Sequence, residues 1–306
     1  MPRPAVDVVV PFLGPPAELA ELAGRLSQLQ LAPGDTLTVA DNRPDAPLRP
    51  PGGAARVIAA PELQTPAFAR NRGAAAGSAE WVVFLDSDTV PPADLVDRYF
   101  TRPPRPRTGL LAGGITDEPP QHNRRDTAAA RWAHLSASMH QDSTLGLGRW
   151  AFAQTANCAV RREAFDAVGG FRDELRACED ADLCYRLGAA GWDIERRDSA
   201  RVVHLSRRTV RALLRQQLVH GAGIGWLERQ YPGAAPPHSW PGFLLWGLRS
   251  SAPALIRAVR ARDRDAALVA LLNPVVAWTR ELGRRRPNIV RPPAPGTARG
   301  PAAASR

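Results

Sequence analysis

The sequence contains no lysine: all 40 of its Lys and Arg positions are arginines, in a chain of 306 residues. A pyridoxal Schiff base requires a lysine amine. P-loop nucleoside triphosphatases and protein kinases each hold nucleotide phosphates with a lysine. The absence of lysine therefore excludes these three classes of enzyme.

Cysteines are few and apolar runs are short. Cys158, Cys178 and Cys184 have neither a C-x-x-C spacing nor an even count, which argues against a zinc site or a disulfide framework and favours a reducing compartment. Asp7 interrupts the only early apolar run, so we expect no secretory signal. No run approaches the ~20 apolar residues of a spanning helix. We therefore expect a cytoplasmic protein.

The net charge of +10 is concentrated at one end of the chain. Residues 1–100 hold 8 arginines and 12 acidic residues, residues 101–200 hold 14 of each, and residues 201–306 hold 18 arginines and 4 acidic residues. Four tryptophans accompany this basic third, at positions 226, 240, 246 and 278. Arginine with tryptophan is typical of helices that lie on an anionic membrane surface. We therefore hypothesise a peripheral position on the inner face of the membrane; the alternative is a solvated helical face over a small core. No nucleic-acid recognition motif is present, so we expect no nucleic-acid partner.

Apolar periodicity predicts strands that alternate with helices over the first 200 residues. Strands are predicted at 6–12, 36–40, 57–58, 81–85, 110–115, 151–160, 194 and 202–203. Helices are predicted at 17–29, 67–76, 94–100, 124–140, from 162, 179–190 and 209–230. This alternation is typical of an α/β fold with a mainly parallel central sheet flanked by helices.

Polar residues follow three of the predicted strands, at Pro11, Asp41 and Asp86–Asp88. Ligands bind at the carboxyl ends of parallel strands, so these ends indicate one site. Asp86 and Asp88 are two residues apart and point the same way in an extended chain, so both carboxylates can reach one Mg²⁺ or Mn²⁺ ion. A solvated turn is the alternative. Two carboxylates at the end of the apolar run 81–85 repel each other unless a cation lies between them, which favours the metal.

Two further groups could take part in chemistry. Glu179 and Asp180 open a predicted helix, where they could complement the helix dipole or act as a general base for an attacking hydroxyl. His204 ends a short strand segment. It could be a structural imidazole or a third metal ligand.

The order of several short motifs resembles family 2 glycosyltransferases of the GT-A fold. The motifs are Val8–Pro11, Val39–Asn42, Ala69–Gly73, Val83–Asp88, Asn157–Arg162, Val168–Phe171, Glu179–Leu183, Arg186-Leu187 and Gly191. Val203–Arg207 with Gln216–Gly225 is loosely similar to the mycofactocin and rhamnosyl-transfer branches of that family. The resemblance implies a catalytic domain over 1–232, with a Rossmann-like nucleotide-sugar half (1–100) and an acceptor half (101–232). A basic helical C-terminal extension (233–286) and a disordered tail (287–306) are expected to follow.

The resemblance also implies roles for individual residues. Pro11 and Phe12 would line the base pocket, Asp41 would contact the nucleobase, and Arg70 would lie near the base or the diphosphate. Asp86, Ser87 and Asp88 would form the motif that contacts the metal and the donor. Asp180, or else Glu179, would be the catalytic base. The family's usual acidic pair is here Asp41-Asn42, which departs from the uridine-specific pattern, and His204 is a provisional third ligand.

The resulting hypothesis is a metal-dependent, inverting glycosyltransferase. It would move a sugar from a nucleoside-diphosphate sugar to a hydroxyl of a lipid, glycan, peptide or small molecule. One alternative is a catalytically silent homologue that binds the nucleotide sugar. The other is a sugar-phosphate nucleotidyltransferase, although Leu13–Glu18 lacks the basic residues that such enzymes usually carry after the first strand.

Overall fold

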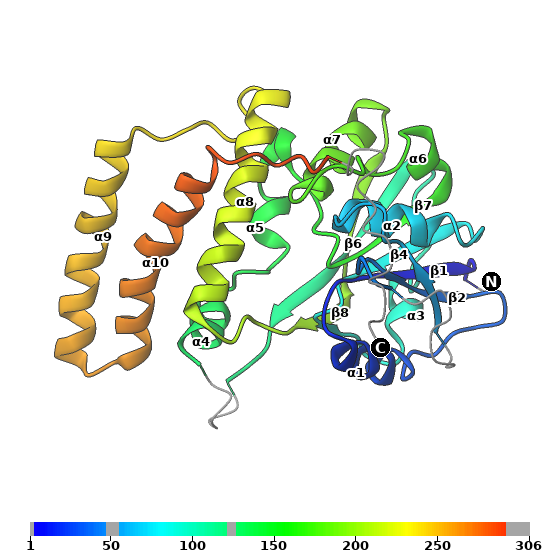
Figure 1. Cartoon of the computed structure of the whole chain (residues 1–306), viewed down its shortest axis with the longest axis horizontal. Helices are drawn as coiled ribbons and strands as arrows, with labels where there is room; N and C mark the ends of the chain where they lie inside the picture. The colour runs from blue at the N-terminus through cyan, green and yellow to red at the C-terminus, as the bar shows by residue number, and fades with distance from the viewer. Residues whose placement is uncertain (1–2, 47–54, 121–126, 292–306) are drawn as a thin grey trace, which may run out of the picture.

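A single mixed sheet forms the centre of the protein, and three long helices stand beside it (Figure 1). The computed structural model describes residues 3–46, 55–120 and 127–291. Its strands are β1 (Val6–Phe12), β2 (Thr36–Asp41), β3 (Arg56–Ala59), β4 (Trp81–Leu85), β5 (Thr89–Val90), β6 (Thr108–Asp117), β7 (Asn157–Arg161) and β8 (Asp193–His204). Across the sheet these strands follow the order β3-β2-β1-β4-β7-β6-β8-β5.

Most neighbouring strands run parallel. β1 pairs in parallel with β2 and β4, β2 with β3, and β6 with β8. β7 lies antiparallel between β4 and β6, and β5 is antiparallel to β8. The predicted α/β architecture with a mainly parallel central sheet is therefore confirmed, and β7 joins its two parallel parts.

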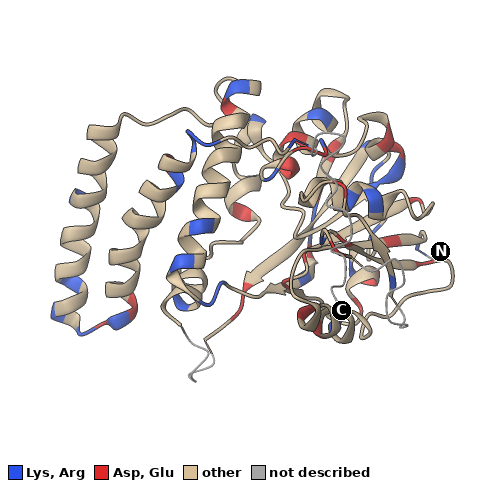
Figure 2. Cartoon of the chain, in the orientation of Figure 1, with Lys and Arg blue, Asp and Glu red and all other residues tan. Residues whose placement is uncertain are grey.

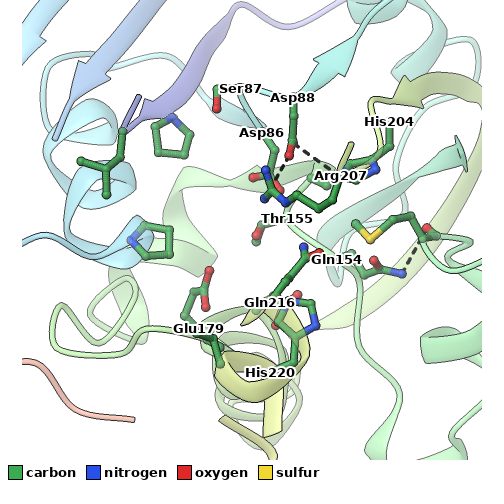
Figure 3. A pocket seen from close by; sticks show the side chains of 18 of the residues that line it. Asp86, Ser87, Asp88, Gln154, Thr155, Glu179, His204, Arg207, Gln216 and His220 are labelled. Atoms are coloured by element: carbon green, nitrogen blue, oxygen red, sulfur yellow. Dashed lines mark hydrogen bonds and ion pairs between the residues drawn. The ribbon is translucent and has the colours of Figure 1, made fainter. Parts of the chain in front are cut away.

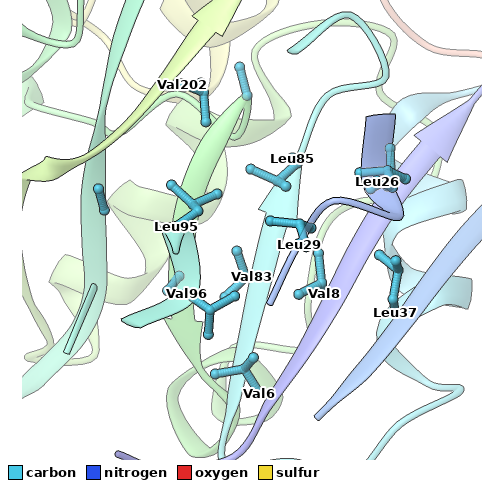
Figure 4. Packing of buried hydrophobic residues seen from close by; sticks show 14 of the residues in the cluster. Val6, Val8, Leu26, Leu29, Leu37, Val83, Leu85, Leu95, Val96 and Val202 are labelled. Carbon is cyan, nitrogen blue, oxygen red and sulfur yellow. The ribbon is translucent and has the colours of Figure 1, made fainter. Parts of the chain in front are cut away.

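Helices cover both faces of the sheet because the strand side chains alternate between the faces. Val8 packs in a cluster with Leu26 of α1 and Leu95 of α3 on one face (Figure 4). Val9 packs on the other face with Ala74 of α2 and Leu183 of α7. The helices of this part are α1 (Pro16–Leu26), α2 (Pro66–Ala74), α3 (Leu95–Tyr99), α4 (Ala128–Leu135), α5 (Asp142–Leu145), α6 (Arg162–Ala167) and α7 (Glu179–Ala189), with a 3₁₀ turn at Gly148–Trp150.

The long helices α8 (Val210–Gln230), α9 (Trp240–Ala261) and α10 (Arg264–Gly283) form a layer in which α10 packs between the other two (Figure 1). Two glycines let α8 approach its neighbours closely. A Cβ at Gly221 would lie 1.9 Å from the Arg280 carbonyl oxygen, and one at Gly223 would lie 2.6 Å from Cys178 Sγ. Helix α8 therefore fixes both α10 and the loop that precedes α7. In the part of the chain that the structure describes, no helix is long and apolar enough to cross a membrane.

The structure differs from the sequence predictions in several places. The helix predicted over 124–140 ends early, because α4 stops at Leu135 and Ala137 has a φ of 47°; residues 124–126 of that prediction lie outside the described residues. β8 is one continuous strand rather than two short pieces, because the charged run that interrupts its apolar pattern buries an ion pair between Glu195 and Arg197 (2.8 Å). β7 begins at Asn157 and therefore covers only the second part of the strand predicted over 151–160. Asn288 is 1% exposed and its carbonyl accepts a hydrogen bond from the Arg176 amide, so the expected disordered tail includes packed residues. Residues 292–306 of that tail lie outside the described residues.

Candidate active site

A cleft of about 1290 Å³ opens where β1 and β4 end and faces helix α8 (Figure 3). All the site residues predicted from the sequence line it except Asp41. They are Pro11, Phe12, Arg70, Asp86, Ser87, Asp88, Glu179, Asp180 and His204. Residues from both halves of the predicted catalytic domain thus meet at one edge of the sheet.

Asp86 and Asp88 follow the buried strand β4 and face cationic side chains. Asp86 Oδ1 accepts a hydrogen bond from an Arg70 terminal nitrogen at 2.5 Å. Asp88 Oδ1 lies 3.5 Å from His204 Nε2, and its Oδ2 lies 3.4 Å from an Arg207 terminal nitrogen. β5 pairs with the end of β8 so that Thr89 lies opposite His204. This pairing brings the histidine beside Asp88.

Asp88 and His204 stabilise each other's charged form. Burial opposes ionisation of Asp88, but the hydrogen bond and charge of His204 with the charge of Arg207 outweigh it, so the pKa of Asp88 lies below its usual value. Burial likewise favours the neutral imidazole. The hydrogen bond and charge of Asp88 outweigh this effect and raise the pKa of His204. The pair is therefore a carboxylate and an imidazolium over a range of pH.

The chemistry of Asp86 and Asp88 fits a hard divalent cation. Both carboxylates attract positive charge, which Arg70, His204 and Arg207 supply in the protein alone. Within residues 3–46, 55–120 and 127–291, no three His, Cys, Asp or Glu side chains are already grouped as a metal site. Mg²⁺ and Mn²⁺ often bind through one or two carboxylates and complete their shell with substrate phosphates and water. The two aspartates fit this mode of binding.

Arg70 of α2 links the end of β4 to the start of α7. Its side chain is 3% exposed, and one terminal nitrogen donates to Glu179 Oε1 at 2.6 Å while the other donates to Asp86. The guanidinium also lies 5.8 Å from the ring centre of Phe171. Burial disfavours the charged guanidinium, but the two carboxylates raise the pKa of Arg70 above its usual value. Arg70 therefore holds the donor-side carboxylate and Glu179 in fixed relative positions.

Asp180 differs from its neighbour Glu179 because it makes no ion pair with any described residue. Its Oδ1 accepts a hydrogen bond from the Ala181 amide at 2.8 Å. Burial and the charge of Glu179 raise the pKa of Asp180 to about 7. A carboxylate with this pKa is poised to accept a proton near neutral pH.

Asp41, which was predicted to contact the nucleobase, pairs with a neighbouring arginine. It is 1% exposed, lies outside the cleft lining, and binds Arg43 through contacts of 2.9 and 2.6 Å. The next residue, Asn42, lines the cleft, and its side-chain nitrogen donates to the carbonyls of Ala60 and Leu63. Asn42 is therefore the residue of this pair that borders the space for a ligand.

The sequence interpretation missed the contribution of α8 and α10. Gln216 and His220 of α8 point into the cleft (Figure 3), and Arg280 of α10 also lines it. Burial, with the charges of Arg280 and Arg207, lowers the pKa of His220 to about 4. His220 is thus a neutral imidazole at neutral pH. The spacing of four residues between Gln216 and His220 places them on one helix face and was the available signal.

The matched family agrees with this geometry. The sequence model of the family described as Glycosyl transferase family group 2 matches residues 81–279. The chain therefore belongs to this family, as its motifs predicted. The match spans β4 with Asp86 and Asp88, the start of α7, and the helices α8 and α10.

Individual relatives support the same assignment. The pre-mycofactocin glycosyltransferase of Mycobacterium tuberculosis (strain H37Rv) is 28% identical over 181 residues, which are 59% of this chain and 38% of that protein. The succinoglycan biosynthesis protein ExoA of Rhizobium meliloti is 34% identical over 100 residues, 33% of this chain and 30% of that protein. The chain thus aligns with less than half the length of these curated relatives.

A solved structure shares the fold. The mannosyltransferase PcManGT of Pyrobaculum calidifontis, in complex with GDP-Man and Mn²⁺, has a TM-score of 0.55 at 18% identity and covers 92% of this chain, which covers 85% of that one. This likeness confirms the predicted GT-A-type fold.

Proposed function

We propose that the protein transfers a sugar from a nucleoside-diphosphate sugar to an acceptor hydroxyl and depends on Mg²⁺ or Mn²⁺ held by Asp86 and Asp88. The observation that carries the proposal is the meeting of Asp86 and Asp88 with Asp180 in one cleft. The family and the complex of the similar mannosyltransferase with GDP-Man and Mn²⁺ support it. Pro11, Phe12 and Asn42 would border the nucleotide.

The residues of the cleft divide the chemistry between them. A bound divalent cation would neutralise charge on the departing diphosphate. Arg70 keeps Asp86 in place, while Arg207 and His204 supply further positive charge at Asp88. Positive groups fixed where negative charge develops lower the barrier to bond cleavage. As a third ligand, His204 would bind the cation through a neutral imidazole and would release its proton to solvent when the cation enters.

Asp180 would take the proton from the attacking hydroxyl. Its raised pKa and its lack of a cationic partner suit it to this role, whereas Glu179 is held by Arg70. Asp86 and Asp88 would be engaged with the metal, and Glu179 is paired with Arg70. The other carboxylates of the described cleft lining, Glu18 and Glu21, are exposed on α1. A single displacement with inversion at the anomeric carbon is the mechanism that this arrangement favours.

The two alternative functions fit the site less well. A nucleotidyltransferase needs basic groups beside a nucleoside triphosphate, and the segment Leu13–Glu18 beside the cleft has none. A silent binding protein has no need for the raised pKa that Asp180 shows. Release of pyrophosphate from a nucleoside triphosphate and a sugar phosphate would support the first alternative, and donor binding without turnover would support the second.

A thermal-shift screen of nucleoside diphosphates and their sugars, with and without Mn²⁺, tests the proposal. A ligand of the folded state raises the melting temperature by mass action. We expect the true donor to raise the melting temperature only when Mn²⁺ is present. Both this shift and sugar transfer should be lost in Asp88→Ala. Asp166→Ala on the exposed face of α6 is the control and should behave as wild type. Full transfer by Asp88→Ala would disprove the metal assignment.

We further propose that the outer face of α9 binds an anionic membrane surface. This face is apolar and exposed: Leu248 is 60% exposed, Ile256 53% and Val259 63%. Helical spacing places Arg249 and Arg260 along its edge, and α9 contains no acidic residue. An apolar stripe beside arginines is the pattern of a helix lying in the lipid interface. The enzyme would then be cytoplasmic and peripheral on the inner face of the membrane.

Vesicle sedimentation tests this surface. The protein should bind phosphatidylglycerol vesicles more strongly than phosphatidylcholine vesicles, and Leu248→Glu should weaken binding to both. Glu163→Gln, at an exposed position of α6, is the control and should bind vesicles as wild type does. Equal binding by Leu248→Glu and wild type would disprove the proposal.

A further inference from the structure

A second, smaller chamber of about 300 Å³ adjoins the cleft on the side away from the nucleotide residues. Its walls are α4, the segment that follows it, the end of β8, α8 and α10. Arg207, Gln216, His220 and Arg280 line both spaces, which makes them continuous. Asp86, Asp88, Pro11 and Phe12 line only the main cleft. His204 lines both spaces, so the chamber borders the proposed metal site through this residue but contains neither the two aspartates nor the nucleotide residues.

Arg280 supplies a positive charge to this chamber without an acidic partner. Its only hydrogen bond within the described chain runs from Nε to Gln217 Oε1 at 2.9 Å, which leaves the two terminal nitrogens available. No carboxylate in the described part of the protein forms an ion pair with it. Arg280 is an exposed residue that lines both spaces, so a ligand can reach its guanidinium. An uncompensated guanidinium in a polar recess favours an anion.

Buried polar atoms in the chamber also lack partners. Ser206 is 6% exposed, and its Oγ has no hydrogen-bond partner among the residues that the structure describes; the same is true of Ser136 Oγ. Buried hydroxyls are normally hydrogen-bonded, so each one indicates a missing partner. Both line the chamber and both can donate to an anion.

Asp117 is the one carboxylate among the described residues of the chamber, and it is already engaged. Asp117 accepts hydrogen bonds from Ser138 Oγ at 3.2 Å and from the Met139 amide at 3.1 Å. It also lies 3.8 Å from His204 Nδ1. Neutral donors thus satisfy carboxylate oxygens of Asp117, and Arg207 faces Asp88 at 3.4 Å. Arg280 is the cation of the chamber that has no acidic partner among the described residues.

The position of Arg280 connects the chamber to the acceptor side of the reaction. Asp180 and Arg280 line the same cleft, and α8 packs against both regions, with Gly221 beside the Arg280 carbonyl and Gly223 beside Cys178, which directly precedes Glu179. A molecule that presents a hydroxyl to Asp180 would therefore extend toward Arg280 and away from the donor. We propose that the acceptor carries an anionic group, a carboxylate or a phosphate, which Arg280, Ser206 and Ser136 bind in this chamber. This inference rests on the proposed function for the identity of the ligand as acceptor.

Calorimetric titration with inorganic phosphate, and separately with acetate, tests the chamber without any donor. Divalent cations are left out, so that the anion is not recruited by Asp86 and Asp88. We expect cation-independent binding that weakens about tenfold in Arg280→Gln, since a charge-assisted hydrogen bond is worth roughly that factor. Arg280→Lys should retain part of it, and Ser206→Ala should weaken it less. The comparison of phosphate with acetate shows which anion the chamber takes.

Arg211→Gln is the matched control, because Arg211 lies on α8 and is exposed but lines neither space. It should bind phosphate as wild type does. Thermal melting of each variant verifies that it is folded. Binding that is unchanged in both Arg280→Gln and Arg280→Lys, or that appears only with Mn²⁺, would overturn the proposal.

A transfer assay then separates this inference from the proposed function. With the donor from the screen above, glycerol and glycerol 3-phosphate serve as neutral and anionic acceptors. Arg280→Gln should raise the KM for glycerol 3-phosphate about tenfold, while the KM for glycerol and the donor affinity stay unchanged. Equal KM values for the two alcohols in wild type would overturn the anionic acceptor. Absence of transfer with every donor would instead disprove the proposed function and leave the phosphate titration as the test of the chamber.

Discussion

The two walls of the cleft differ in how their charges are matched. On the sheet wall, Arg70 pairs with Asp86 and Glu179, and Asp88 lies beside His204. On the wall of α8 and α10, Arg280 has no acidic partner in the described residues. Figure 2 shows the same contrast on a larger scale, with acidic and basic residues mixed over the sheet and blue predominating on α8. Matched charges hold a geometry, whereas unmatched ones are available to a ligand.

Asp180→Asn removes the one carboxylate of the proposed chemistry that has no cationic partner among the described residues, and should have the largest effect on kcat. We expect kcat to fall by roughly 10²–10⁴, the usual contribution of a general base, because asparagine cannot accept the proton. Donor affinity should stay within about twofold, since Asp180 does not belong to the metal pair. Steady-state transfer assays and donor titration measure the two quantities.

Glu179→Gln is the matched comparison for this prediction. Glutamine removes one of the two charges around Arg70 but keeps the size of the side chain. We expect a smaller loss of kcat than in Asp180→Asn. If Glu179→Gln were the more damaging variant, the assignment of the base would move to Glu179.

Arg70→Met tests the matched wall. It removes the cation that faces two carboxylates and leaves Glu179, which is 6% exposed, without its partner. Breaking a buried pair in this way typically costs about 3–5 kcal/mol of unfolding free energy. Denaturant unfolding in the absence of divalent cations measures it.

Arg72→Met, two residues along the same helix, is the control. Arg72 is 51% exposed and pairs with Glu62 at 3.1 Å. Exposed ion pairs are worth about 0–1 kcal/mol. Equal destabilisation by the two variants would show that Arg70 is not a structural link between β4 and α7.

The sequence predicted much of this matched wall and little of the other. Residues i and i+2 at the end of an apolar strand identify Asp86 and Asp88 without any knowledge of tertiary structure. The role of Arg70 as a link between Asp86 and Glu179 depends on contacts between residues 109 positions apart, which local patterns do not encode. The ion pair of Asp41 with Arg43 is likewise visible only in three dimensions.

The helical wall was harder to predict because its signal is tertiary packing. The long helix at 209–230 was predicted, and the structure has α8 at Val210–Gln230. The sequence does not show which face of α8 borders the cleft, because Gly221 and Gly223 matter only through their close approach to Arg280 and Cys178. Arg280 lies 100 residues after Asp180 and joins the site only because α10 packs on α8.

Gly223→Ala tests whether α8 positions the catalytic loop. A Cβ there would lie 2.6 Å from Cys178 Sγ and 2.9 Å from the Ala177 carbonyl oxygen, so the loop must shift. We expect a loss of about 1–3 kcal/mol in stability, as for other overpacked sites, together with a reduced kcat. Gly24→Ala in α1 is the control: its Cβ would meet nothing within 4 Å. Alanine in an exposed helix interior should stabilise by about 0.5–1 kcal/mol.

The pH dependence of the reaction should follow the unmatched carboxylate. Burial and Glu179 raise the pKa of Asp180 to about 7, so the base is mostly protonated at pH 6 and mostly ionised at pH 8. The value of kcat should therefore rise by about tenfold between these two pH values and level off above them. A flat profile over this range would argue against Asp180 as the base.

The raised pKa of Asp180 also predicts how the free energy of unfolding depends on pH, with the opposite sign from that of a salt-bridged aspartate. The pKa of Asp180 is higher in the folded protein than its usual value of 3.8, so the folded state binds the proton more tightly than the unfolded state does. The contribution of this group to stability is therefore fully present below pH 3.8 and is lost as the pH rises through about 7. Asp180→Asn removes the charge, so the variant should be more stable than wild type by roughly 4 kcal/mol at pH 8, because the pKa rises from 3.8 to about 7, and should lose that advantage in acid. Urea unfolding of both proteins at pH 5 and pH 8 measures this difference in stability. A difference that does not change with pH would show that Asp180 keeps an ordinary pKa and would argue against Asp180 as the catalytic base.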